Sequence, residues 1–144
     1  MMLILKRIIS FYFLFALILL CNSCMYLLGD KKLGEGYILS EDGKYTSIVK
    51  STTKPYRGSG LEVIPPTVTK FKANKNYIIA LSIDIETKVR NYWIINKSIT
   101  INLADCKDQA SCDSVLRSNV EGPLDSVLFN KKLKENSIPL SFDN

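Results

Sequence analysis

Histidine is absent from all 144 residues of this chain. The absence removes the commonest general base and the commonest metal ligand among the side chains, so catalytic triads built on histidine are excluded. Cysteine occurs only four times, and the cysteines do not follow the ligand spacings of zinc or iron–sulfur sites. We therefore expect no bound metal and no cofactor.

Carboxylates are the remaining source of acid–base chemistry, and no motif brings two of them together. Glu62 and Asp84 are the only pair that we single out, as candidates for a carboxylate-dependent hydrolase. Two S-x-x-K matches, at Ser47–Lys50 and Ser51–Lys54, lack the helix and the companion motifs of serine acyltransferases. The preferred interpretation is a protein that is not an enzyme.

The amino terminus has the order of a secretory signal: two basic residues, an uncharged apolar run over Ile8–Leu20 and a short polar step. Ser23 is small and directly precedes Cys24, as a peptidase that cuts beside a lipid-modified cysteine requires. The segment resembles a bacterial lipoprotein signal, with Cys24 as the acylated first residue of the mature chain. Cys21 departs from the pattern, because such signals more often carry Leu, Val or Ile there. An uncleaved anchor that continues through Met25–Leu28 is the alternative.

Cleavage before Cys24 divides the chain into a signal peptide over 1–23, a lipidated tether over 24–33 and one domain over 34–144. The mature chain retains 17 basic and 14 acidic residues, a net charge of +3. Because the basic residues form no concentrated stripe in the sequence, nucleic acid is not an expected partner. No acidic run follows Cys24, and we expect a cell-envelope protein on the outer membrane that faces the periplasm.

Two cysteines remain in the domain, Cys106 and Cys112, within the stretch DCKDQASCD. An even pair in an oxidising compartment predicts a disulfide. Closing so short a loop would contribute about 2 kcal/mol on the chain-entropy model. A metal site that combines both thiolates with Asp105, Asp108 or Asp113 is the alternative, disfavoured because the chain has no histidine.

Hydrophobic periodicity from Gly36 onward predicts antiparallel strands. Asp42-Gly43 is a favoured two-residue hairpin turn between two of them. A long strand over Tyr77–Ile85 is expected to bury one face, made of Ile79, Leu81, Ile83 and Ile85, with Ser82 and Asp84 on the other. The other expected strands cover 36–41, 44–50, 61–64, 67–72 and 92–96, with a last one in which Ile99, Ile101 and Leu103 alternate with polar residues.

Two helices are expected after these strands. Pro123 is predicted at the first helical position, Asp125 in the first turn, and Lys132 and Lys134 near the end. A shorter helix is predicted over about 108–118. The core-facing residues of the longer helix are expected to be Leu124, Val127, Leu128 and Leu133. The fold class is therefore α+β, an antiparallel meander of about six strands with one or two C-terminal helices packed on one face.

Aromatic residues are spread along the strand region. An exposed row of them on a sheet could hold a glycan, a small ligand or a peptide strand. Ordinary packing in the core and at strand edges explains the same residues. The possible binding aromatics are Tyr37, Tyr77, Tyr92 and Trp93.

Five short motifs, taken in order, resemble a family of small bacterial lipoproteins that is common in Bacteroidetes and carries a domain of unknown function. The resemblance covers most of the mature chain, but the segment Ser98–Glu121, which holds both domain cysteines, is longer than expected for the family. It implies a lipid-anchored envelope protein and supplies no catalytic residues. The motifs are GEGY at Gly34–Tyr37, IPP at Ile64–Pro66, YIIA at Tyr77–Ala80, YWIINK at Tyr92–Lys97 and GPL at Gly122–Leu124, with Phe129 after them.

These features favour a non-enzymatic interaction module, tethered to membrane lipid through acylated Cys24, that binds an unknown envelope protein or glycan. An inhibitor or immunity-type protein is one form of this hypothesis. A lipoprotein that binds a glycan or small ligand through its aromatic residues is the alternative, and a carboxylate-dependent hydrolase is the third.

Overall fold

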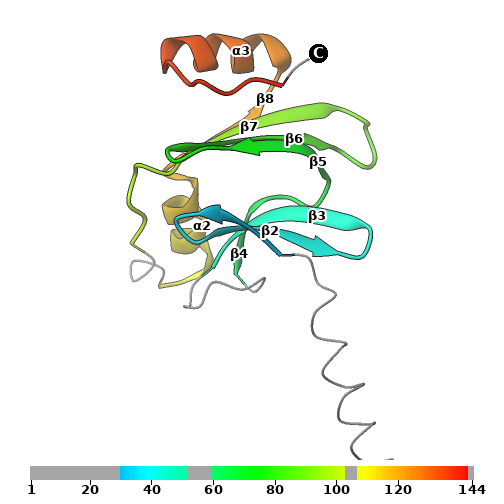
Figure 1. The fold of residues 1–144 in the computed structure, drawn as a ribbon. Helices are drawn as coiled ribbons and strands as arrows, with labels where there is room; N and C mark the ends of the chain where they lie inside the picture. The colour runs from blue at the N-terminus through cyan, green and yellow to red at the C-terminus, as the bar shows by residue number, and fades with distance from the viewer. Residues whose placement is uncertain (1–29, 52–59, 103–106, 143–144) are drawn as a thin grey trace, which may run out of the picture.

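The computed structural model describes residues 30–51, 60–102 and 107–142 (Figure 1). Within these ranges the strands form two antiparallel sheets of four, in the orders β1-β2-β3-β4 and β5-β6-β7-β8. The first sheet contains β1 (Lys31–Gly34), β2 (Tyr37–Asp42), β3 (Tyr45–Lys50) and β4 (Leu61–Ile64). The second sheet contains β5 (Val68–Ala73), β6 (Tyr77–Ile83), β7 (Arg90–Asn96) and β8 (Val120–Leu124). The helices of the described residues are α2 (Gln109–Arg117) and α3 (Ser126–Glu135).

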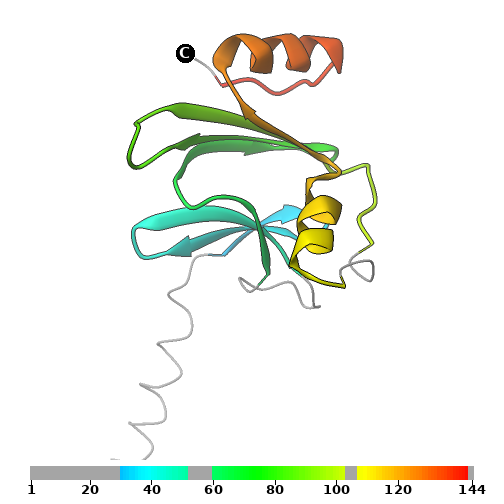
Figure 2. The same cartoon turned by 180° about the vertical axis from the view of Figure 1, so that it is seen from behind.

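Three layers stack on one another, as both views of the ribbon show (Figures 1 and 2). The first sheet is one outer layer, the second sheet lies in the middle, and α3 covers the far face of the second sheet. Helix α2 connects β7 to β8 in the chain and packs near β8 at the side of the sheets. The middle sheet is therefore covered on both faces.

Each face of the middle sheet has its own hydrophobic core. The core between the sheets includes fully buried side chains from both, among them Ile48, Ile64 and Ile78. The core under α3 combines Ile79 and Ile94 of the sheet with three buried residues that come after β8: Phe129, Leu133 and Ile138. Burial of each such apolar side chain contributes roughly 1.5–3 kcal/mol.

Strand β6 is buried on both faces, which corrects the expectation of one buried and one polar face. Ile78, Ala80 and Ser82 are buried as well as Ile79 and Leu81. The reason is its position, because β6 is an inner strand of the middle layer. Ile85, expected on the buried face, lies beyond the end of β6 and is 53% exposed.

The α+β class is confirmed, but the single six-stranded meander is wrong, because the strands form two separate sheets. Strand β4 pairs with β3, whereas β5 begins the second sheet. The break falls at Pro65-Pro66, directly after β4, where proline has no main-chain N–H for a ladder. The first strand, β1, begins at Lys31, within the segment 24–33 that was expected to be the tether.

The predicted hairpin of β2 and β3 is confirmed, with its turn displaced by one residue. Asp42 pairs with Tyr45, so the turn residues are Gly43 and Lys44. Gly43 has a φ of 59°, a value that glycine adopts without steric cost. Asp42 therefore ends a strand instead of entering the turn.

The expected strand around Ile99 and Ile101 is wrong, since residues 97–102 lie outside the strands and Leu103 lies outside the described residues. Strand β8 takes the place beside β7 instead, with Ile95 opposite Val120. A strand from a distant segment therefore completes the sheet, and hydrophobic alternation alone does not identify which segment does so.

The start of the C-terminal helix also differs from the prediction. Pro123 lies in β8, an edge strand that tolerates the missing N–H, and Asp125 is the N-cap, whose carboxylate accepts a hydrogen bond from Leu128 N (2.8 Å). The helix buries Phe129 and Leu133, while Val127 is 78% exposed and Leu128 is 39% exposed. Lys132 and Lys134 lie in the last turn, as predicted, and α2 forms where the shorter helix was expected.

Candidate functional site

Two of the four candidate binding aromatics lie in the core between the sheets. Tyr37 is 1% exposed and Trp93 is 5% exposed. The Tyr37 hydroxyl accepts a hydrogen bond from Asn119 Nδ2 (2.8 Å), and Trp93 Nε1 donates to Ser82 Oγ (2.8 Å). These side chains are structural, and the four aromatics do not form one exposed row.

The other two candidates, Tyr77 and Tyr92, lie on the opposite face and are partly buried in the core under α3. Tyr92 stacks on Phe129 with the ring centroids 4.9 Å apart, and the Phe142 ring lies 6.4 Å from it. The stacking attaches α3 and the C-terminal segment to the sheet. Packing therefore accounts for this group.

The predicted lipidation site, Cys24, lies outside the described residues, and so does Cys106. Cys112 lies half-buried in α2. Asp108 caps that helix, with its carboxylate accepting a hydrogen bond from Ser111 N (2.8 Å). The Cys106–Cys112 disulfide and the acylation of Cys24 stay predictions.

The carboxylates considered for hydrolysis have separate surroundings. Glu62 lies in β4 of the first sheet, opposite Val49. Asp84 follows β6 of the second sheet and binds groups of its own loop. Within residues 30–51, 60–102 and 107–142, no group of three or more carboxylate or thiol side chains is placed to hold a metal ion.

Two lysines converge on the tight turn between β1 and β2. Gly34, Glu35 and Gly36 all have positive φ values, of 91°, 50° and 75°. Lys97 Nζ donates to Leu33 O (2.7 Å), and Lys50 Nζ donates to the main-chain oxygen of Glu35. The turn therefore has two ammonium groups bound to its carbonyls.

Burial dominates the electrostatics of this turn. It lowers the pKa of the Lys50 and Lys97 ammonium groups, while the negative charge of Glu35 partly opposes the shift. Burial also raises the pKa of the Tyr37 hydroxyl, and Lys50 Nζ lies 4.3 Å from the centroid of that ring. Lysines with a lowered pKa can act as nucleophiles, but these two bind main-chain oxygens and hold the turn.

A second group of residues, at one end of the sheets, resembles a binding surface more closely than the β1–β2 turn does. The β2–β3 turn, the β4–β5 connection over 65–67 and the β6–β7 loop over 84–89 lie at the same end of the sheets. Thr67 N donates to Thr46 O (3.0 Å), and Ile83 N donates to Thr67 O (3.1 Å). Both hairpin tips lie on the same side of the molecule in Figures 1 and 2. We call this surface the hairpin end.

The β6–β7 loop of the hairpin end is held in one shape by Asp84. Its Oδ1 accepts hydrogen bonds from Glu86 N (3.0 Å), Thr87 N (2.7 Å) and Thr87 Oγ1 (2.8 Å). Its main chain donates to Val89 O (2.9 Å) and accepts from Lys88 N (3.0 Å). The hydrogen bonds from Thr87 hold the pKa of the Asp84 carboxyl below its usual value, so the carboxylate is ionised at neutral pH and can accept these bonds.

The hairpin end exposes apolar side chains on this fixed scaffold. Tyr45 is 51% exposed, and Ile85 and Val89 are each 53% exposed. Ile85 also lines a shallow pocket of about 280 Å³, together with Pro65 and Pro66. Exposed apolar groups on ordered loops bind a protein surface at a low cost in conformational entropy.

Sequence reasoning missed both key residues of this surface. The alternation of β6 predicts that Ile85 is buried, and no sequence motif singles out Val89. The signal that could have revealed the loop is the Asp84–Thr87 spacing, since an aspartate that caps main-chain N–H groups two and three residues later ends a strand in a turn.

Comparisons of this chain with protein-family models, with curated proteins and with solved structures found no match. The resemblance to the lipoprotein family therefore stays a prediction from the motifs. None of the helices in the described part of the chain is long and apolar enough to cross a bilayer.

Proposed function

We propose that this protein is a non-enzymatic lipoprotein of the bacterial cell envelope, anchored through acylated Cys24, whose domain binds an envelope protein through the hairpin end. The observation that carries the binding role is the exposure of Ile85 and Val89, each 53%, on a loop fixed by Asp84. A surface of this kind suits an inhibitor or an immunity-type protein that covers part of its partner.

The anchoring role is supported by the order of residues at the amino terminus. Basic residues, the apolar run Ile8–Leu20 and the small Ser23 precede Cys24, as an acylated cysteine requires. Seven residues then separate the start of the mature chain from β1 at Lys31. The tether is short, and the domain would work close to the membrane on the outer-membrane side of the periplasm.

A paired set of variants tests the binding surface. The unaltered chain is expected to recover a stoichiometric protein complex from an envelope extract. The double variant Ile85→Asp and Val89→Asp should lose it, because charged side chains cannot enter an apolar contact without a large desolvation cost. The control Ile99→Asp and Val127→Asp changes two other exposed apolar residues, 45% and 78% exposed, and should retain the complex.

Two results would contradict the proposal. Recovery of the same complex by both double variants would exclude the hairpin end as its binding surface. A complex absent from all three samples, together with fluorescence of the chain that responds to cell-wall glycan fragments, would favour the glycan-binding alternative instead.

A further inference from the structure

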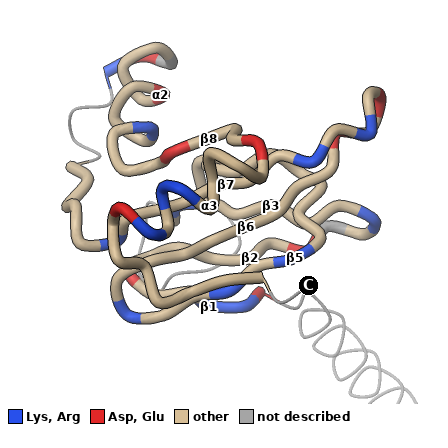
Figure 3. The backbone as a smooth tube through the Cα atoms, turned by 90° about the horizontal axis from the view of Figure 1, so that it is seen from above, with Lys and Arg blue, Asp and Glu red and all other residues tan. Residues whose placement is uncertain are grey.

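The edges of the two sheets meet on one side of the molecule, where β1 lies beside β5. Lys31 of β1 places its Nζ 4.9 Å from the centroid of the Phe71 ring of β5. Each strand is the outermost of its sheet, and blue segments that mark basic residues follow both strands in Figure 3. We call this side the lysine edge, defined by Lys31, Lys32, Lys70 and Lys72.

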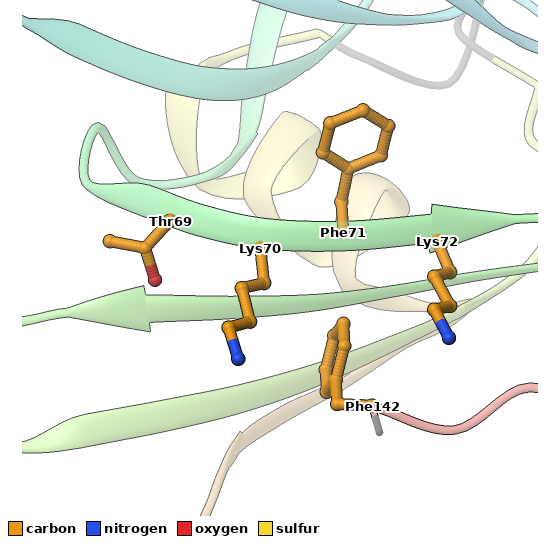
Figure 4. A pocket seen from close by; sticks show the side chains of 5 residues that line it. All are labelled: Thr69, Lys70, Phe71, Lys72 and Phe142. Carbon is orange, nitrogen blue, oxygen red and sulfur yellow. The ribbon is translucent and has the colours of Figure 1, made fainter. Parts of the chain in front are cut away.

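Two adjoining shallow pockets run along the lysine edge and share Phe71 and Lys72. One, of about 380 Å³, lies between Lys70 and Phe142, and the other, of about 490 Å³, lies beside Lys31 and Lys32. Figure 4 shows Phe71 on one side of β5, with Lys70 and Lys72 on the other. The linings of the two pockets include four lysines and no acidic side chain.

The lysine edge is also where the proposed anchor enters the fold. Lys31 is the first residue of β1, and the segment 24–30 can reach at most about 25 Å when fully extended. If Cys24 carries acyl chains, the leaflet that holds them lies within that distance of Lys31. A leaflet of anionic phospholipid attracts lysines that come within about a Debye length of it, roughly 8–10 Å.

We propose that the lysine edge rests on anionic phospholipid headgroups of the membrane that holds Cys24. This inference depends on the proposed anchoring and adds a preferred orientation, with β1 and β5 toward the lipid. Phosphate groups are complementary to Lys31, Lys32 and Lys70, and each lysine that reaches an anionic leaflet strengthens association about fivefold.

Protection of open strand edges is the competing explanation for these lysines. Charged residues on edge strands prevent pairing with other chains, and both β1 and β5 are edge strands. That role predicts aggregation when the lysines are replaced, but it predicts no response to the charge of a membrane.

The test uses the full chain purified from its membrane and reconstituted into vesicles of phosphatidylcholine, with or without phosphatidylglycerol. A water-soluble amine reagent labels exposed lysines, and mass spectrometry compares the labelling of Lys31, Lys32 and Lys70 with that of Lys131 and Lys134 in α3. We expect the lysine edge to be labelled several-fold more slowly than α3 on anionic vesicles only, with the difference removed by high salt.

A matched pair of variants separates the position of the lysines from the net charge of the protein. Lys31→Gln, Lys32→Gln and Lys70→Gln together should weaken the preference for anionic vesicles by tenfold or more, whereas Lys44→Gln, Lys131→Gln and Lys134→Gln, with the same net charge, should not. Equal labelling of both faces on both vesicles would overturn the proposal. If the first variant only aggregates while labelling of the unaltered chain ignores lipid charge, edge protection explains the lysines.

This experiment distinguishes a failure of the proposed acyl anchor from a failure of the proposed orientation. Flotation of the unaltered chain with neutral vesicles reports the acyl anchor alone. Flotation with both vesicles but uniform labelling would keep the anchor and reject the orientation. Flotation with anionic vesicles only would reject the anchor and keep the lipid-binding edge, and protection of the lysines in native envelopes but not in vesicles would assign the edge to a protein partner.

Discussion

At the scale of single residues, Lys97 shows how a charged side chain can be part of the architecture. It is 9% exposed, and its ammonium group donates to Leu33 O across 64 positions of sequence. The bond joins the end of β7 in the second sheet to β1 in the first. Periodicity could not predict this role, because a lysine in a polar stretch is normally solvated.

Replacement of Gly34 tests the turn that Lys97 holds. A Cβ at Gly34 would lie 2.9 Å from Lys97 Nζ, at a φ of 91°. Gly43→Ala is the control, since that residue also has a positive φ, 59°, but no atom within 4 Å of the added Cβ. We expect Gly43→Ala to cost about 1–2 kcal/mol and Gly34→Ala about 1 kcal/mol more, because the Lys97 hydrogen bond must shift. Equal losses in chemical denaturation would show that Lys97 Nζ moves aside without loss of its hydrogen bond to Leu33 O.

The ionised carboxylate of Asp84 provides a second prediction at the scale of residues. Because its folded pKa lies below the unfolded value, Asp84 stabilises its loop above the unfolded pKa, and this contribution is lost as the pH falls through the folded pKa. Asp84→Ala should therefore speed hydrogen exchange at the Glu86 and Thr87 amides at neutral pH. Glu86→Ala, which removes an exposed carboxylate of the same loop, should leave the Thr87 amide unchanged. Similar exchange in both variants would mean that Asp84 does not fix the loop.

At the scale of elements, local patterns predicted the strands and helices better than their partners. The β2–β3 hairpin needs only a turn between two β-rich runs, so the sequence around Gly43 was sufficient. The division into two sheets depends on which strands pair after Pro65-Pro66, and the pairing of β7 with β8 joins segments separated by α2. Hydrophobic alternation indicates which face of a strand is the more apolar. It contains no information on which strand lies beside it.

Helix α3 offers the clearest test at this scale, because its buried face differs from the expected one. Phe129 is 2% exposed, whereas Val127 is 78% exposed. We expect Phe129→Ala to lower the free energy of unfolding by about 3 kcal/mol or more and Val127→Ala to change it by less than about 0.5 kcal/mol. A larger loss of stability for Val127→Ala than for Phe129→Ala, in thermal or chemical unfolding, would show that the face predicted from the sequence is the buried one.

At the scale of the whole molecule, the two proposed functions belong to two different surfaces. The lysine edge, next to the start of β1, would face the membrane, while the hairpin end with Ile85 and Val89 would meet the partner. The lysine edge cannot be recognised from the composition, because its lysines come from strands far apart in the sequence and the mature net charge is only +3. The hairpin end cannot be recognised from the sequence pattern, because Ile85 continues the alternation of β6, whereas the strand itself ends at Ile83.

The central claim is the lipid anchor, and the intact mass of the protein purified from its native membrane tests it most directly. We predict a mass equal to residues 24–144 plus a diacylglyceryl group, with or without a further acyl chain, and loss of this species in a Cys24→Ala variant. An unmodified full-length mass in both proteins would contradict the claim, and it would make the apolar amino terminus a retained anchor with Cys24 as an ordinary thiol.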